Sequence, residues 1–303
     1  MIPSPEHISV AALDTPEGNR RVAQACAQHG FFYLTDHGLN TQLPQFIDAM
    51  MGIFDLPLED KRALTRTEEN PWGYFDRELT KNRRDWKEIF DCGIDTGNSV
   101  SQWPTRSDFK PQIMAWFGAA EGICQLLLEA ICRSLELNTN ILSGCFSHGH
   151  TSFLRLNHYP PCPEPQTSLS EGHLGISHHT DAGAVTLLLQ ADVAGLQFLV
   201  DESWYTVPPD GDALLVNVGD LVQVWSNDQY KAPIHRVLAN KSEHRYSAAF
   251  FYNPSFNTTV EPLVGALPRY SPFTWQEFRS ARATGDYADT GSEAQISDYR
   301  VAS

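Results

Sequence analysis

Basic residues are scarce in this 303-residue sequence, and their scarcity excludes whole classes of partner. Lysine and arginine number 22 against 37 aspartates and glutamates, which gives a formal net charge of −15. A chain with this charge repels polyanions on average, so we expect it to bind neither nucleic acid nor an anionic membrane surface. The six cysteines form no CxxC pair, and we therefore expect free, buried thiols rather than a disulfide framework.

Long apolar runs are also missing. The opening segment, MIPSPEHISVAALDTPEGNRR, has no apolar core behind basic residues, so we expect no secretory signal. We find no uninterrupted apolar stretch long enough to span a bilayer, no internal repeat and no signature of a subunit interface. These absences predict a cytoplasmic, monomeric protein.

A change of pattern near residue 150 divides the sequence. Before it, apolar residues recur at helical spacing in several places. Residues 15–30 fit a helix that Thr15 opens, and residues 41–55 fit a second helix. Residues 108–137 carry apolar positions over many turns and predict one long helix.

After residue 150, short runs rich in Val, Leu, Phe and Tyr alternate with clusters of Gly, Pro, Asn and Asp. Short strands at this spacing are typical of a β-sandwich or barrel, of which the double-sheet jelly roll is one form. We therefore expect a mainly β protein with flanking helices. The predicted strands are residues 152–160, 184–190, 196–200, 204–209, 213–219, 222–227, 235–239 and 245–253, with a further one upstream at 31–38.

Three metal-capable side chains stand in GISHHTDAGAVTLLLQ, residues 175–190, at the entrance of a predicted strand. Alternate residues of a strand point to the same face, so His179 and Asp181 project together and His178 projects away. An imidazole and a carboxylate on one face make two ligands of a divalent metal site. An HxD triplet alone is weak evidence, because a surface turn explains it equally well.

A second segment, APIHRVLANKSEHRYSAAFF, strengthens the metal hypothesis. It places His235 at the head of one strand and puts Arg245 and Ser247 on a common face of another. Two histidines and one carboxylate form the facial triad of non-haem Fe(II) oxygenases. An inward-pointing arginine is costly unless it meets an anion, and its planar guanidinium suits a carboxylate.

The order HTD, a distal HR and then RxS resembles the iron- and 2-oxoglutarate-dependent dioxygenases of the isopenicillin-N-synthase-like family. The segments CAQHGFFYLTDHGL, LRLNHYPPCPEP and VNVGDLVQVWSND are similar to family segments, and GYFDRELTKNRRDWKEIFD resembles one of flavonol-synthase-like members. The match runs in order over about residues 20–280. It implies a double-stranded β-helix (jelly-roll) core, supported by one long helix and preceded by an α/β region.

The resemblance also implies a division of the chain and a set of site residues. It suggests an N-terminal helix/strand region at 1–105 and a dioxygenase core at 106–284. The polar, small-residue-rich composition of 285–303 separately predicts a loosely ordered tail. The resemblance implies Fe(II) as the metal, 2-oxoglutarate and O2 as co-substrates, and oxidation of a small molecule of specialised metabolism with release of succinate and CO2. The implied residues are His179, Asp181 and His235 for iron; Arg245, Ser247, Tyr159 and Asn157 for 2-oxoglutarate; and Phe251, Arg155 and Phe75 for the substrate.

Other functions stay open at this point. An iron oxidase of the same fold would use no 2-oxoglutarate, and its RxS pair would bind a carboxylate of the substrate. A non-catalytic protein could simply hold a small acidic metabolite. A zinc hydrolase could use the same three ligands, although it would not need the inward arginine and serine. The sequence identifies neither the substrate nor the choice between hydroxylation, desaturation and cyclisation.

Overall fold

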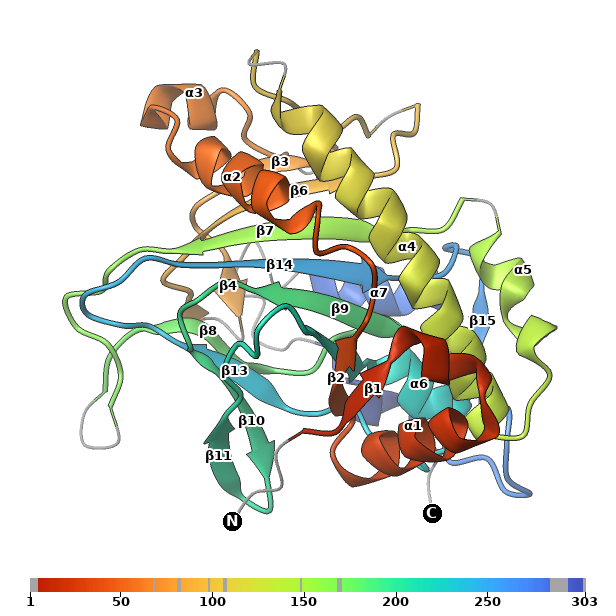
Figure 1. The fold of residues 1–303 in the computed structure, drawn as a ribbon. Coiled ribbons are helices and arrows are strands. Elements are labelled where there is room, and N and C mark those ends of the chain that lie inside the picture. Colours follow the sequence, from red (N-terminus) through yellow and green to blue (C-terminus); the bar gives the residue numbers. More distant parts are fainter. Residues whose placement is uncertain are drawn as a thin grey trace.

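Two β-sheets face each other at the centre of the protein, and helices cover the outer side of the larger one (Figure 1). Most of both sheets comes from the second half of the chain, as the strand pattern predicts. The computed structural model describes residues 5–67, 69–80, 83–97, 99–105, 108–147, 149–167, 171–283 and 294–301.

The larger sheet has eight strands and combines the two ends of the chain. Neighbouring strands are antiparallel except for the first pair, which is parallel. N-terminal strands therefore extend the core sheet directly at both edges. In spatial order the strands are β1 (His7–Ser9), β2 (Phe31–Thr35), β12 (Leu214–Val218), β9 (Val185–Gln190), β14 (Arg245–Tyr252), β7 (Phe153–Tyr159), β6 (Glu88–Gly93) and β3 (Gly73–Phe75).

The smaller sheet brings two predicted metal ligands together. Its strands, in spatial order, are β11 (Ser203–Thr206), β10 (Leu196–Val200), β13 (His235–Leu238) and β8 (Leu174–His179). In the antiparallel pairing of β13 with β8, His235 lies directly opposite His179. Two short hairpin-like sheets complete the β-structure: β4 (Leu79–Thr80) with β5 (Arg83–Arg84), and β15 (Thr259–Val260) with β16 (Phe273–Thr274).

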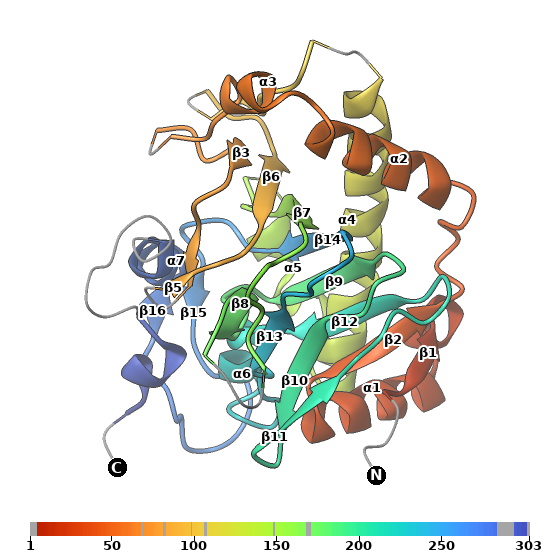
Figure 2. The same ribbon diagram turned by 90° about the vertical axis from the view of Figure 1, so that its left-hand side faces the viewer.

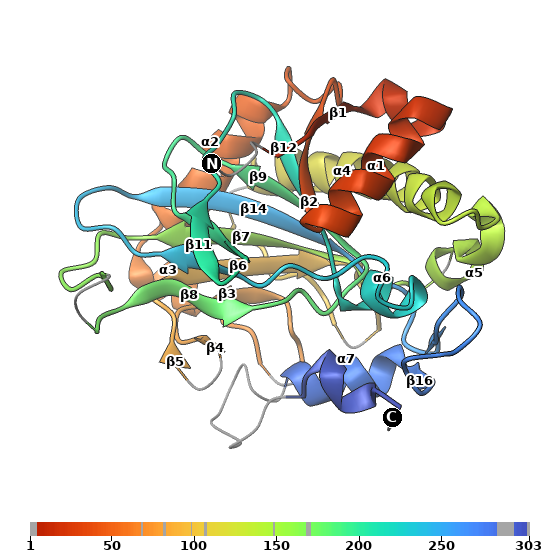
Figure 3. The ribbon, with the colours of Figure 1, turned by 90° about the horizontal axis from the view of Figure 1, so that it is seen from below.

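Three helices lie on one side of the sheets, while the last helix lies on the other (Figures 2 and 3). The first begins as predicted, because the Thr15 hydroxyl accepts a hydrogen bond from the Gly18 amide. The three are α1 (Pro16–Gln28), α2 (Leu43–Phe54) and α4 (Phe109–Ser134), and the last is α7 (Trp275–Ala283). Shorter helices are α3 (Leu58–Arg62), α5 (Ser143–Phe146), α6 (Asp220–Trp225), η1 (Val10–Asp14), η2 (Thr139–Ile141) and η4 (Ile296–Tyr299).

The long helix α4 is the main support of the larger sheet. Phe117 on α4 meets Phe250 on β14 edge to face, with ring centroids 5.0 Å apart. By length and composition alone α4 could cross a membrane, although we expected no stretch long enough to do so. However, 56% of its most apolar window is buried inside the protein. This burial is typical of a core helix. All six cysteines are free, as expected, and five of them are buried.

The structure corrects three expectations. Residues 222–227 do not form a strand, because most of them belong to the helix α6. Five of the six side chains of α6 are buried, so the alternation of apolar and polar residues cannot distinguish a strand from a helix there. Strand β8 was missed. Residues 294–301 are packed rather than loose, since Tyr299 lies against Phe273 and the Arg300 guanidinium donates to Asp228 at 2.8 Å. The other residues of the predicted loose tail lie outside the described residues.

Candidate active site

A cavity opens between the two sheets and collects all of the predicted site residues except Phe75. The pairing of β14 with β7 sets Arg245 opposite Tyr159 and Ser247 opposite Asn157. Alternate side chains of both strands point inward, as the period of two requires. The cavity is lined by Phe153, Arg155, Asn157, Tyr159, Arg245, Ser247, Ala249, Phe251 and Asn253 from this pair, and by His179, Asp181 and His235 from the metal segments.

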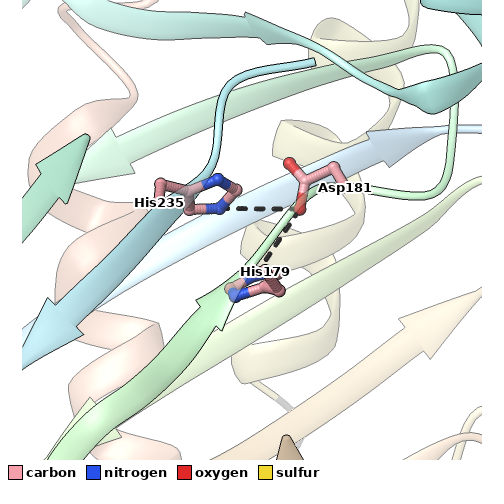
Figure 4. Close-up of side chains that lie close together, drawn as sticks. All are labelled: His179, Asp181 and His235. Carbon is pink, nitrogen blue, oxygen red and sulfur yellow. Dashed lines mark ion pairs between the residues drawn. The ribbon is translucent and has the colours of Figure 1, made fainter. Parts of the chain in front are cut away.

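The three predicted metal ligands converge on one another among the residues that line the cavity (Figure 4). The Nε2 atoms of His179 and His235 lie 3.8 and 3.7 Å from Oδ1 of Asp181. Each imidazole Nδ1 lies against a backbone carbonyl oxygen, that of Ser177 at 2.8 Å and that of Pro233 at 3.1 Å. A carbonyl can only accept, so Nδ1 carries the proton and Nε2 keeps a free lone pair for a metal ion.

Hydrogen bonds also orient the carboxylate of Asp181. Its Oδ2 accepts from the Thr186 hydroxyl at 2.5 Å and from the Asn217 amide at 2.7 Å, which leaves Oδ1 facing the imidazoles. Burial by itself would raise the pKa of Asp181, but the imidazoles and these two hydrogen bonds hold it below its usual value. Burial and the neighbouring His235 lower the pKa of His179 to about 3. The ionised carboxylate and the neutral imidazole are the forms that bind a metal.

This donor set fits the expected iron. Two imidazole nitrogens and one carboxylate oxygen lie within 4.8 Å of one another. Two histidines and a carboxylate around one point form a facial triad, which leaves the remaining coordination positions open toward the cavity. The chemistry of the ligands therefore agrees with Fe(II).

Arg245 is a buried guanidinium that borders the same cavity. The residue is 1% exposed. Its Nε and Nη2 donate to the Val193 carbonyl and to Gln190 Oε1, both at 3.2 Å, while Nη1 has no hydrogen-bond partner among the described residues. Burial lowers the pKa of Arg245, which is the sign of a charge removed from water. A buried guanidinium with a free N–H, next to the Ser247 hydroxyl, fits the distal carboxylate of 2-oxoglutarate.

The structure places the three predicted substrate residues in different surroundings. Phe251 lines the cavity and stacks on Phe153, with centroids 4.7 Å apart. Arg155 also lines the cavity, but its guanidinium binds both carboxylate oxygens of Asp91 at 2.8 Å and reaches Glu78. Phe75 is not among the lining residues of the described cavity.

The ring of Phe75 lies instead beneath the Arg66 guanidinium, 4.5 Å from its centroid. Strand alternation did not predict a further group of lining residues, because they come from segments without a regular strand pattern. They are Glu78, Thr80 and Lys87 from the N-terminal half, and Trp275, Arg279 and Arg282 from α7.

Comparisons with known proteins agree with this geometry. The family model described as the 2OG-Fe(II) oxygenase superfamily matches residues 150–254, and that of the non-haem dioxygenase in morphine synthesis N-terminal region matches residues 8–108. Jasmonate-induced oxygenase 4 of Arabidopsis thaliana is 34% identical over 279 residues, which cover 88% of this chain and 78% of that protein. Gibberellin 20 oxidase 2 of Oryza sativa subsp. indica is 34% identical over 93% of this chain and 79% of its own length.

The chain belongs to the 2OG-Fe(II) oxygenase family. The crystal structure of JOX2 in complex with 2OG, Fe and JA superposes on this oxygenase with a TM-score of 0.85 and 26% identity, covering 98% of this chain and 89% of that one. The oxygenase therefore uses Fe(II), 2-oxoglutarate and O2 to oxidise a small molecule, and its facing sheets are the expected jelly-roll core. The family assignment argues against the zinc hydrolase and the non-catalytic binder.

Proposed function

We propose that His179, Asp181 and His235 hold Fe(II), and that Arg245 and Ser247 bind the distal carboxylate of 2-oxoglutarate. Asn157 and Tyr159 lie beside them and complete the co-substrate site. We further propose that the oxidised substrate is a small molecule with an apolar body and an acidic group.

One observation carries the co-substrate assignment. The unpartnered Nη1 of Arg245 is buried in the same cavity as the three metal-binding side chains. A buried guanidinium needs an anion, and 2-oxoglutarate supplies a carboxylate at the end remote from the metal. In the oxidase alternative this anion would belong to the substrate, but JOX2 was solved with both 2OG and Fe.

The charge of the cavity supports an acidic substrate. Five basic side chains line it against two carboxylates, in a protein whose formal net charge is −15. Arg245 is assigned to the co-substrate, and Arg155 is neutralised by Asp91 and Glu78. Arg279 lies over the ring of Phe153 at 5.9 Å. A guanidinium above a stacked aromatic pair suits a carboxylate attached to an apolar body.

The protein's own contribution to the reaction is placement. The metal ion, with 2-oxoglutarate and O2, supplies the oxidising power. Phe153 and Phe251 form an apolar wall that fixes the substrate and keeps water from the reacting C–H bond. Arg279 at the same wall holds the acidic group, which selects the carbon that faces the metal.

Succinate release, measured for small aromatic and alicyclic acids paired with their methyl esters, tests the proposal. We expect acids, but not esters, to stimulate 2-oxoglutarate turnover, and Arg279→Gln to remove this preference. Arg21→Gln is the control, because Arg21 forms a surface ion pair with Glu6 away from the cavity. Equal stimulation by acids and esters would contradict the acidic substrate.

A further inference from the structure

Lys87 is a buried lysine at the cavity, and the proposed mechanism does not use it. It immediately precedes β6, and the pairing of Glu88 with His158 puts it at the next ladder position, beside Tyr159. Its side chain is 2% exposed and lines the cavity together with His179. A lysine is rarely buried to this degree unless its charge has a partner.

Two carboxylates hold this lysine in its charged form. The Nζ atom lies 2.6 Å from Glu78 Oε2 and 3.6 Å from Asp85 Oδ2. Burial alone would lower the pKa of Lys87, but these carboxylates raise it above its usual value. Asp85 is itself fixed, because it accepts from the Thr80 hydroxyl at 2.8 Å and from the Ser177 amide at 3.1 Å.

The two carboxylates do not occupy all the hydrogen-bond donors of Lys87. Glu78 also binds Arg66 at 3.2 Å and Arg155 at 2.8 Å, so one carboxylate serves three cations. Asp85 lies beyond hydrogen-bond distance from the ammonium. Asp91 also pairs with Arg66 and Arg155, so three carboxylates balance three cations in this cluster. What Lys87 offers the cavity is therefore an ammonium with three donors, of which Glu78 takes one.

The position of Lys87 links the two ends of the co-substrate site. Lys87 lines the same cavity as His179, and the strand register places it beside Tyr159. The Tyr159 ring in turn lies 4.8 Å from the Arg245 guanidinium. An ammonium has three donors on a flexible stem, and it can follow a carboxylate that adjusts its position near a metal.

We propose that Lys87 is a second carboxylate-binding group of the active site, separate from Arg245. This inference rests on the proposed function, because it assumes that iron and 2-oxoglutarate occupy the cavity. Two carboxylates are candidates for such a group: the one at the keto-acid end of 2-oxoglutarate and the one on the proposed substrate.

Four variants separate binding from structure. Lys87→Met removes the charge at similar length, and Lys87→Met with Glu78→Gln removes both charges of the pair, so that no extra buried carboxylate is left behind. Lys87→Arg keeps the charge. Lys61→Met is the matched control, since Lys61 is a buried lysine bound to Glu88 at 2.8 Å but does not line the described cavity.

The readout is anaerobic binding, followed by visible absorption of the iron-loaded protein. If Lys87 serves the co-substrate, 2-oxoglutarate affinity falls about tenfold in both Lys87→Met proteins, is partly restored in Lys87→Arg and is unchanged in Lys61→Met. If it serves the substrate, 2-oxoglutarate binds normally, but phenylacetate shifts the spectrum of the loaded wild type and not of the Lys87→Met proteins.

The inference is overturned if the two Lys87→Met proteins match the wild type in both titrations, or if Lys61→Met shows an equal loss. Arg245→Gln separates this failure from a wider one. If Arg245→Gln weakens 2-oxoglutarate binding while the Lys87 variants do not, only the role of Lys87 is wrong. If Arg245→Gln also binds normally, the proposed co-substrate site is wrong.

Discussion

The hydrogen bonds onto Asp181 predict how strongly the oxygenase holds its metal. Oδ2 of Asp181 accepts from Thr186 and Asn217, and this fixes Oδ1 toward the two imidazoles. Replacing Thr186 with Val removes one of these hydrogen bonds with almost no change of shape. Only the Asn217 amide then holds Oδ2, so the carboxylate is less firmly oriented and one of its lone pairs loses a partner in a buried site.

The expected loss follows from the charge of the acceptor. A hydrogen bond to an ionised group contributes about 1.5–3 kcal/mol, which corresponds to about 10- to 150-fold in an equilibrium constant. Partners that orient metal ligands affect metal affinity by about 10- to 100-fold. We therefore expect Thr186→Val to weaken metal binding by about 10- to 100-fold, and Thr186→Val with Asn217→Leu to weaken it further.

Titration of the metal-free protein with Co(II), followed by visible absorption, measures this affinity without turnover. Thr258→Val is the matched control, because Thr258 is a buried threonine whose hydroxyl contacts Ser255, and it does not line the described cavity. Metal binding by Thr186→Val within about twofold of the wild type would refute the claim that these hydrogen bonds orient the ligand.

Three further outcomes are expected. Burial raises the pKa of Asp85 from 3.8 to about 7. Between these two pKa values the folded protein keeps a proton on Asp85 that the unfolded chain has released. The free energy of unfolding therefore falls as pH rises from about 4 to about 7, by at most about 1.4 kcal/mol per pH unit. Asp85→Asn removes this slope and should gain urea stability over the wild type at pH 8 but not at pH 4, whereas equal gains would contradict it. Arg282 donates to the Thr180 carbonyl at 2.8 Å, between the proposed ligands His179 and Asp181, so Arg282→Gln should weaken Co(II) binding several-fold; unchanged affinity would refute the link. A Cβ added at Gly195 would lie 3.1 Å from Cδ of Arg245, so Gly195→Ala should raise the Kd for 2-oxoglutarate while Co(II) affinity stays constant.

Strand periodicity explains why much of the site was predictable. Arg245 and Ser247 point inward together because they are alternate residues of one strand, and Asn157 and Tyr159 do so on the strand beside it. These relations are local, so the sequence reveals them. The family resemblance then linked segments that lie far apart in the sequence. In the structure, for example, His235 lies opposite His179 on the neighbouring strand.

Long-range contacts explain what the sequence could not reveal. Arg155 was expected at the substrate, but two carboxylates from the N-terminal half hold its guanidinium, and nothing in the local pattern shows that Asp91 and Glu78 come so close. The basic residues of α7 reach the cavity only because the chain returns there after β16. Residues 222–227 alternate like a strand, yet near-complete burial of α6 makes that pattern uninformative.

The central claim is that the cavity binds Fe(II) and 2-oxoglutarate together through the assigned residues. Addition of 2-oxoglutarate to the anaerobic, iron-loaded protein tests it most directly, with the visible spectrum as the readout. We expect a charge-transfer band in the wild type, none in Asp181→Ala, and one in Arg245→Gln only at much higher 2-oxoglutarate concentrations. Bound iron without any band in the wild type would contradict the assignment and leave the carboxylate at Arg245 to the substrate.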